Sequence, residues 1–206
     1  MPVFSVNGKR VLFMHVPKAG GTTIEQVFNS YPTSFHSEIP PAGLKCTPQH
    51  LIFRDMRVLL GGIGWDYGFA VVRDPYKRVE SEYRFRTEIT AERYGKTPDF
   101  SLWLSTYLDA FARDEFLLDN HFRPQAAFVS PDIDVFRLED GMESILARVS
   151  EKLGVQLSYD GNFWNETDKS LEIKWDPDIL ERFNSVYAGD FGLLGYEKRS
   201  PAITVG

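Results

Sequence analysis

Two segments of the chain combine residue types that can bind a phosphate or sulfate group. The first reads Pro17-Lys18-Ala19-Gly20-Gly21-Thr22-Thr23. The two glycines allow the backbone to approach an anion, free amides at a helix start can point at it, and Lys18 adds a mobile positive charge. Since the lysine precedes the glycines, the Walker pattern GxxxxGK[ST] is absent. The simpler interpretation of these residues is a tight strand-to-helix turn with an exposed lysine.

The second segment begins at Arg73, which follows an apolar run and precedes Asp74-Pro75. A guanidinium at the end of a strand can bind a phosphate through two parallel hydrogen bonds. Ser81 offers a hydroxyl on the helix that Asp74-Pro75 should start. The alternative is that Arg73 pairs with Asp74 or Glu80 on a solvated face.

Apolar runs and helix-start signals show which elements must position these residues. Buried strands are expected over residues 11–16, 69–72 and 135–138. Helices are expected over residues 22–28, 49–60, from 75 to beyond 86, 142–153 and 178–187. Strands of this kind, alternating with helices, predict an α/β fold in which a parallel β-sheet is flanked by helices. Ligands of such sheets bind at the carboxyl ends of strands, where both segments lie.

Composition narrows the classes of function. A length of 206 residues with 43% hydrophobic residues favours a single domain spanning residues 1–206. The formal charge of −6 disfavours a nucleic-acid binder. Residues 45–96 nevertheless carry ten basic and seven acidic side chains, so an anion site is expected in the first half. Cys46, the only cysteine, cannot form an internal disulfide. No run is apolar enough for a signal peptide or a transmembrane segment, which predicts a cytoplasmic protein.

Together the two segments resemble the cofactor loops of sulfotransferases that use 3'-phosphoadenosine 5'-phosphosulfate (PAPS). The resemblance is to the carbohydrate sulfotransferase group, sulfotransferase family 2, which includes heparan sulfate 2-O-sulfotransferases. In that family a PKxGGT-type loop holds the 5'-phosphosulfate, and residues 17–23 match this loop. An RDPxxRxxSxY segment supplies an arginine and a serine to the 3'-phosphate, and Arg73 and Ser81 match these two residues. The family also has segments similar to residues 46–51, 120–125, 135–139 and 190–196. The resemblance implies a P-loop nucleotide-hydrolase-like architecture.

The resemblance also implies a reaction, in which a sulfuryl group moves from PAPS to a hydroxyl of a carbohydrate or glycolipid acceptor without a metal. Lys18 would stabilise the leaving phosphate, and a histidine suits removal of the acceptor's proton. His50 is our candidate base because its segment resembles that of the family's catalytic histidine, and His121 is the second candidate. Substrate-binding roles are expected for His121 and Arg123, and Trp164 is a candidate for holding the adenine.

Two other functions remain open at this point. One is a small kinase or other nucleotide-triphosphate enzyme with a variant phosphate loop. Such enzymes need Mg²⁺ and a group to hold it, yet Pro17 and Arg73, not acidic residues, follow the two strands. The other is a non-catalytic module that binds a nucleotide or a glycan. The presence of both Lys18 and a candidate base argues against it.

Overall fold

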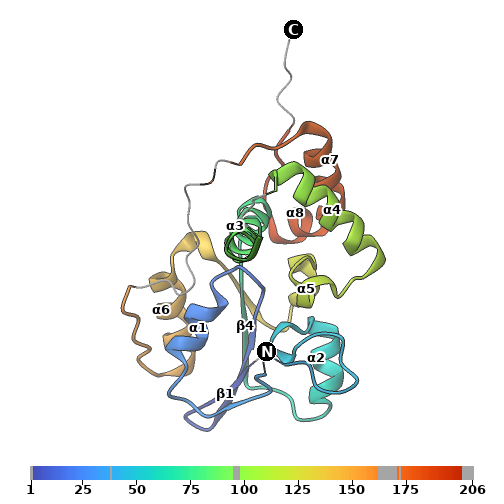
Figure 1. The fold of residues 1–206 in the computed structure, drawn as a ribbon. Helices are drawn as coiled ribbons and strands as arrows, with labels where there is room; N and C mark the ends of the chain where they lie inside the picture. The colour runs from blue at the N-terminus through green and yellow to red at the C-terminus, as the bar shows by residue number, and fades with distance from the viewer. Residues whose placement is uncertain (1, 38, 95–97, 162–170, 172, 201–206) are drawn as a thin grey trace.

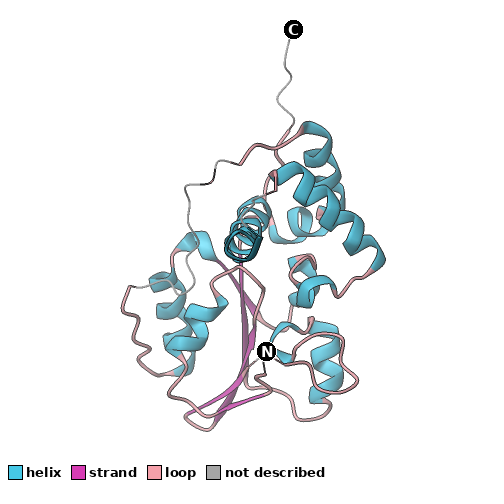
Figure 2. Cartoon of the chain, in the orientation of Figure 1, coloured by secondary structure: helices cyan, strands magenta, loops and turns pink. Residues whose placement is uncertain are grey.

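A five-stranded sheet with the strand order β3-β1-β2-β4-β5 lies at the centre of the fold (Figure 2). The computed structural model describes residues 2–37, 39–94, 98–161, 171 and 173–200 (Figure 1). In chain order the strands are β1 (Val3–Val6), β2 (Lys9–Met14), β3 (Thr33–Ser34), β4 (Tyr67–Val72) and β5 (Asp134–Arg137). The α/β class is therefore confirmed.

The sheet is parallel only in part. β2, β4 and β5 run parallel, as predicted, whereas β1 pairs antiparallel with β2 and β3 pairs antiparallel with β1. Asn7 and Gly8 connect β1 to β2 and have φ angles of 49° and 77°. Positive φ at both central residues is what a tight β-hairpin turn requires, and Asn-Gly is its common sequence. This pair explains the antiparallel edge that the apolar runs alone did not predict.

Helices cover both faces of the sheet, with α1 and α6 on one side of β4 and α2 on the other in Figure 1. The helical elements are α1 (Gly21–Val27), η1 (Pro48–His50), α2 (Phe53–Leu60), α3 (Pro75–Tyr94), α4 (Phe100–Arg113), α5 (Leu117–Asn120), η2 (Gln125–Phe128), η3 (Leu138–Asp140), α6 (Met142–Leu153), α7 (Pro177–Val186) and α8 (Ala188–Leu194). Alternate residues of β2 point to opposite faces: Leu12 packs with α2, and Phe13 packs with α1 and α6. A third, aromatic-rich core joins α3, α4, α7 and α8.

The expected helices over 22–28, 142–153 and 178–187 are present within one residue at each end. The helix expected over 49–60 is divided instead, because Leu51 and Ile52 are extended between η1 and α2. Thr47 precedes Pro48 at the start of this segment, a position typical of an N-cap, but its hydroxyl makes no cap hydrogen bond and donates to Asp119 at 2.7 Å. Among the described residues, no helix is long and apolar enough to cross a membrane.

Candidate active site

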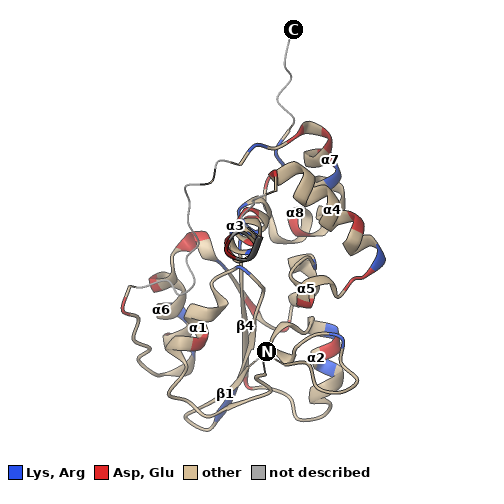
Figure 3. Cartoon of the chain, viewed as in Figure 1, with Lys and Arg blue, Asp and Glu red and all other residues tan. Residues whose placement is uncertain are grey.

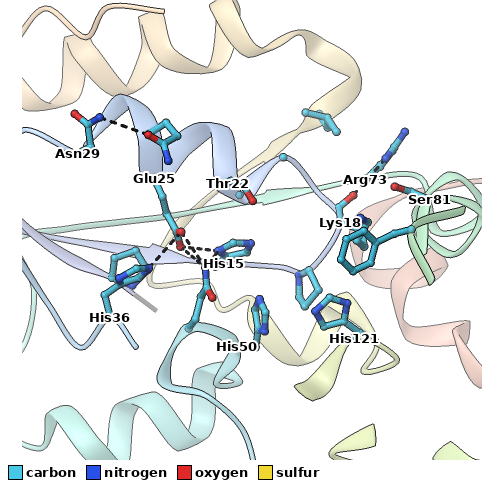
Figure 4. Close-up of a pocket in the computed structure, with 18 of the residues that line it drawn as sticks. His15, Lys18, Thr22, Glu25, Asn29, His36, His50, Arg73, Ser81 and His121 are labelled. Atoms are coloured by element: carbon cyan, nitrogen blue, oxygen red, sulfur yellow. Dashed lines mark hydrogen bonds and ion pairs between the residues drawn. The ribbon is translucent and has the colours of Figure 1, made fainter. Parts of the chain in front are cut away.

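The carboxyl ends of β2 and β4 open onto a cavity of about 880 Å³ (Figure 4). Both predicted segments contribute to its lining: residues 17, 18 and 20–22 from the first, and Arg73 and Ser81 from the second. Arg73 Nη1 donates to the carbonyl of Lys18 at 3.3 Å. His50 and His121 line the same cavity. The structure therefore brings most of the predicted site residues together.

The loop after β2 depends on two glycines for different reasons. Gly20 has a φ of 81°, in the left-handed region that favours glycine. Gly21 lies against the ring of His15, so close that a Cβ there would be 2.2 Å from His15 Nε2. His15 is buried, and its Nδ1 is 2.6 Å from Glu25 Oε1 on α1. His15 thus packs against the loop and connects the end of β2 to α1.

The two predicted segments place the cations Lys18 and Arg73 at the cavity. Within the described part of the chain, neither Lys18 nor Arg73 forms an ion pair; Lys18 Nζ lies 4.1 Å from the centre of the Phe85 ring. Burial is the main cause that lowers the pKa of both side chains. Arg84 also lines the cavity, and its buried Nε has no hydrogen-bond partner among the described residues. This end of the cavity can accommodate an anion with more than one negative charge.

Segments far along the chain hold Arg73 in place. The amide of Arg73 donates to Gln125 Oε1 at 2.9 Å, and Gln125 Nε2 donates to the carbonyl of Arg73 at 2.7 Å. Gln125 is held in turn by Asp190, whose Oδ2 accepts the Gln125 amide at 3.0 Å. These contacts show what the segments around residues 125 and 190 contribute. They fix the backbone from which the Arg73 guanidinium extends.

Arg78 is a site residue for which the sequence indicated no role. It is buried, with Nε donating to the carbonyl of Pro17 at 2.9 Å and Nη2 to that of His121 at 2.7 Å. It therefore connects the loop after β2 with the segment that carries His121. Two local signals marked its position: it is the second arginine of the RDPxxRxxSxY segment, and its spacing three residues before Ser81 puts both on one part of α3.

Three histidines stand in a row along the cavity (Figure 4). The ring centres of His15 and His50 are 5.0 Å apart, and those of His50 and His121 are 4.9 Å apart. Neighbouring rings are nearly perpendicular, at 89° and 87°. Burial lowers the pKa of His50 and of His121, so both are mainly neutral at pH 7. A neutral imidazole has one nitrogen free to accept a proton.

Each ring in the row has a carboxylate at Nδ1. Asp119 Oδ2 is 2.6 Å from the Nδ1 of His50, and Glu82 Oε2 is 2.8 Å from the Nδ1 of His121. Although burial alone would raise the pKa of Glu82, His121 and Arg86 lower it to about 2. Burial would likewise raise the pKa of Asp119, but hydrogen bonds from His50 and Thr47 bring it well below its usual range. Both carboxylates are therefore ionised at neutral pH.

The remaining predicted residues lie elsewhere. Ala19, in the loop, and Thr23, in α1, are buried and do not line the cavity. Arg123 is also outside the cavity lining, since its Nη1 donates to Glu115 at 2.5 Å and its guanidinium lies over Phe116. Trp164 falls outside the described residues. No group of histidine, cysteine or acidic side chains in the described ranges could hold a metal ion.

The two sides of the cavity differ in chemistry. Figure 4 shows Lys18, Arg73 and Ser81 on one side, Glu25 and Asn29 on the other, and the histidine row between them. Amide side chains line the Asn29 side: Gln26, which accepts a hydrogen bond from Asn29, Asn29 itself, and Gln49, which donates to Glu25. The cavity thus has an anion site on one side, a polar site of low charge on the other, and a row of possible bases between them.

Comparison with known proteins gives one match. A family model described as "Sulfotransferase family" matches residues 3–197, nearly the whole chain. No curated protein and no solved structure matches the chain.

Proposed function

The chain belongs to the sulfotransferase family, and we propose that it transfers a sulfuryl group from PAPS to a hydroxyl group of a carbohydrate or glycolipid. The observation that carries this proposal is the pairing of an anion site with a row of neutral histidines in one cavity. Membership of the family supports sulfuryl transfer in general. The cofactor, the acceptor class and the roles of individual residues are our inferences from the cavity.

The residues at one end of the cavity suit PAPS, which has a 5'-phosphosulfate and a 3'-phosphate. Lys18 and the loop of Gly20 and Gly21 would hold the 5' group, and Arg73 and Ser81 the 3'-phosphate. Burial lowers the pKa of Lys18 and of Arg73 although nearby carboxylates, among them Glu82 and Glu139, act in the opposite direction, so burial outweighs the counter-charge present. A bound anion would add to that counter-charge.

We assign the general base to His50. When bound, PAPS supplies a sulfuryl group whose sulfur bonds to the acceptor oxygen as the bond from sulfur to the phosphate oxygen breaks. His50 Nε2 accepts the proton of the acceptor hydroxyl. The ammonium group of Lys18 stabilises the negative charge that develops on the leaving phosphate. His121, on the other side of His50 from His15, is the alternative base.

The Asn29 side of the cavity suits an acceptor with many hydroxyl groups and little charge. Gln26, Asn29 and Gln49 can each donate and accept hydrogen bonds, as recognition of sugar hydroxyls requires. Glu25, the charged residue there, is already bonded to His15 and to Gln49. The described residues that line this side include no lysine or arginine to match a long, highly sulfated polymer, so a neutral or lightly charged glycan fits better.

Calorimetric titration tests the proposal. Adenosine 3',5'-bisphosphate and ATP are each titrated into the protein, in EDTA and again with Mg²⁺. Binding of the bisphosphate that is independent of metal is the expected result, whereas preference for ATP with Mg²⁺ would refute the proposal in favour of a kinase or NTPase. Transfer of labelled sulfate from PAPS to a panel of glycans and glycolipids then tests the acceptor class. A protein that binds the bisphosphate but transfers nothing would be a binding module.

A further inference from the structure

A left-handed turn lies directly beside His50. Leu118, Asp119 and Asn120 have φ angles of 48°, 60° and 63°. L-residues adopt this conformation singly, mostly as Asn or Asp, because the Cβ atom crowds the backbone. Three consecutive residues, one of them a leucine, persist in it only when surrounding contacts hold them.

The contacts of this turn converge on His50 and its helix. The Asp119 carboxylate accepts the Thr47 amide at 2.6 Å and the Thr47 hydroxyl at 2.7 Å, and lies 2.6 Å from His50 Nδ1. Asn120 is fully buried, and its Nδ2 donates to the carbonyl of His50 at 2.9 Å. Neighbouring residues of the turn thus hold the imidazole and the main chain of His50.

We infer that Asp119 is a positioning residue that keeps the His50 proton on Nδ1 and the lone pair on Nε2, facing the cavity. An ionised carboxylate can only accept hydrogen bonds, so the Nδ1 beside it must be the donor. In a neutral ring the second nitrogen is then the acceptor. Among the described residues, Nε2 of His50 makes no hydrogen bond. The inference rests on the proposed function, in which this nitrogen takes the acceptor's proton.

Each proton and each electron pair that moves in the reaction has a destination at the site. The proton of the acceptor hydroxyl moves to His50 Nε2, the oxygen–sulfur bond forms, and the electron pair of the broken sulfur–oxygen bond stays on the leaving phosphate. The resulting imidazolium still donates its Nδ1 hydrogen to the Asp119 carboxylate, and the negative charge of that carboxylate compensates the positive charge of the ring. The rings of His15 and His121 face His50 from either side, with Glu25 and Glu82 at their own Nδ1 atoms. Both of these carboxylates also favour the positive charge.

The isosteric variant Asp119→Asn tests this role. The Thr47 amide still needs an acceptor, so the Asn oxygen takes the place of Oδ1, and its NH₂ group then faces His50 Nδ1. That group donates to Nδ1, which moves the ring proton to Nε2 and removes the lone pair that the reaction needs. We expect kcat for sulfuryl transfer to fall about 10²- to 10⁴-fold. The affinity for adenosine 3',5'-bisphosphate should not change.

Nitrogen-15 NMR of the histidine rings reads the tautomer without any turnover. The wild type should show His50 protonated at Nδ1 and Asp119→Asn should show it protonated at Nε2. A merely structural role for Asp119 would not move this signal. Wild-type protein with the proton on Nε2 refutes the inference, even where the variant does not fold. If the wild type shows no sulfuryl transfer activity, the proposed function is refuted. The position of the His50 ring proton still tests the role of Asp119 in that case.

Two matched variants make the rate measurement specific. Asp109→Asn makes the same change at a surface residue paired with Arg182 and should keep the wild-type kcat. Glu82→Gln makes the corresponding change beside His121. Full activity in Asp119→Asn, together with loss of activity in Glu82→Gln, would move the base to His121 and overturn the inference.

Discussion

Gly21→Ala should destabilise the protein although alanine is the better helix former. Gly21 is the first residue of α1, and its φ is not in the left-handed region. In a helix interior, alanine in place of glycine gains about 0.5–1 kcal/mol. Here the new Cβ would be 2.2 Å from Nε2 and 2.3 Å from Cδ2 of His15, where ordinary contact begins at 3.4 Å. One of the two residues must therefore shift by about an ångström.

His15 cannot move away at low cost. Its Nδ1 is 2.6 Å from Glu25, and its ring packs at 5.0 Å against His50 and 5.7 Å against Phe13. Overpacking of a core costs about 1–3 kcal/mol. Loss of a hydrogen bond to a charged group adds about 1.5–3 kcal/mol. The two costs exceed the gain in helix propensity, and we expect the free energy of unfolding to fall by about 2–4 kcal/mol.

Urea unfolding measures this change, and Gly192→Ala is the matched control. Gly192 lies within α8, and no heavy atom lies within 4 Å of a Cβ placed there, so its substitution should stabilise the protein by about 0.5–1 kcal/mol. In a His15→Ala background the imidazole that would clash with the new Cβ is absent. Gly21→Ala should therefore lower the free energy of unfolding by at least about 1 kcal/mol less than it does in the wild type. A Gly21→Ala variant as stable as the wild type would refute the reasoning.

Three further predictions concern the histidine row. His50→Ala should lower turnover about 10²- to 10⁴-fold while calorimetry shows an unchanged affinity for the bisphosphate; near-normal turnover would exclude His50 as the base. Because burial lowers the pKa of His50 from 6.5 and the neutral ring is the base, kcat/KM should be constant above pH 6.5 and fall in acid, and a rise on acidification would contradict this. The carboxyl of Glu82 has a pKa of about 2 in the folded protein against 4.5 unfolded, so its contribution to stability is present above pH 4.5 and lost as the pH falls toward 2. Urea unfolding at pH 7 and pH 3 should show the part of this loss that falls above pH 3, about 2 kcal/mol for a single carboxyl, and a smaller loss in Glu82→Gln.

Local patterns in the sequence located both segments that line the cavity because both depend on neighbours in the chain. Asp74, for example, caps α3 by accepting the Lys77 amide at 2.9 Å, as its position before a proline predicted. The β1–β2 hairpin had an equally local signal in Asn7-Gly8. Its first strand, β1, has only four residues and lacks the long apolar run by which β2 and β4 were recognised.

The partners of the histidines could not be predicted in this way. Asp119 comes 69 residues after His50, and Glu82 comes 39 residues before His121. No spacing rule connects such pairs, since they meet only when α3, η1 and α5 converge on the cavity. The same long-range contact takes up the Thr47 hydroxyl, which would otherwise be free to cap the helix expected over 49–60. Arg123 lies outside the cavity for a similar reason, since Glu115 binds it.

Net charge is a poor guide to this site because what matters is which charges are paired. The chain has a formal charge of −6, and its acidic side chains are spread over outer helices such as α4, α6 and α7 (Figure 3). Close to the cavity, Glu25 and Glu82 are bound by histidines. Lys18 and Arg73 have no ion-pair partner in the described ranges, and burial has lowered the pKa of each. A bound phosphate or sulfate would give these buried cations a direct ion pair, so an acidic protein can bind a multiply charged anion at this position and repel it over the rest of its surface.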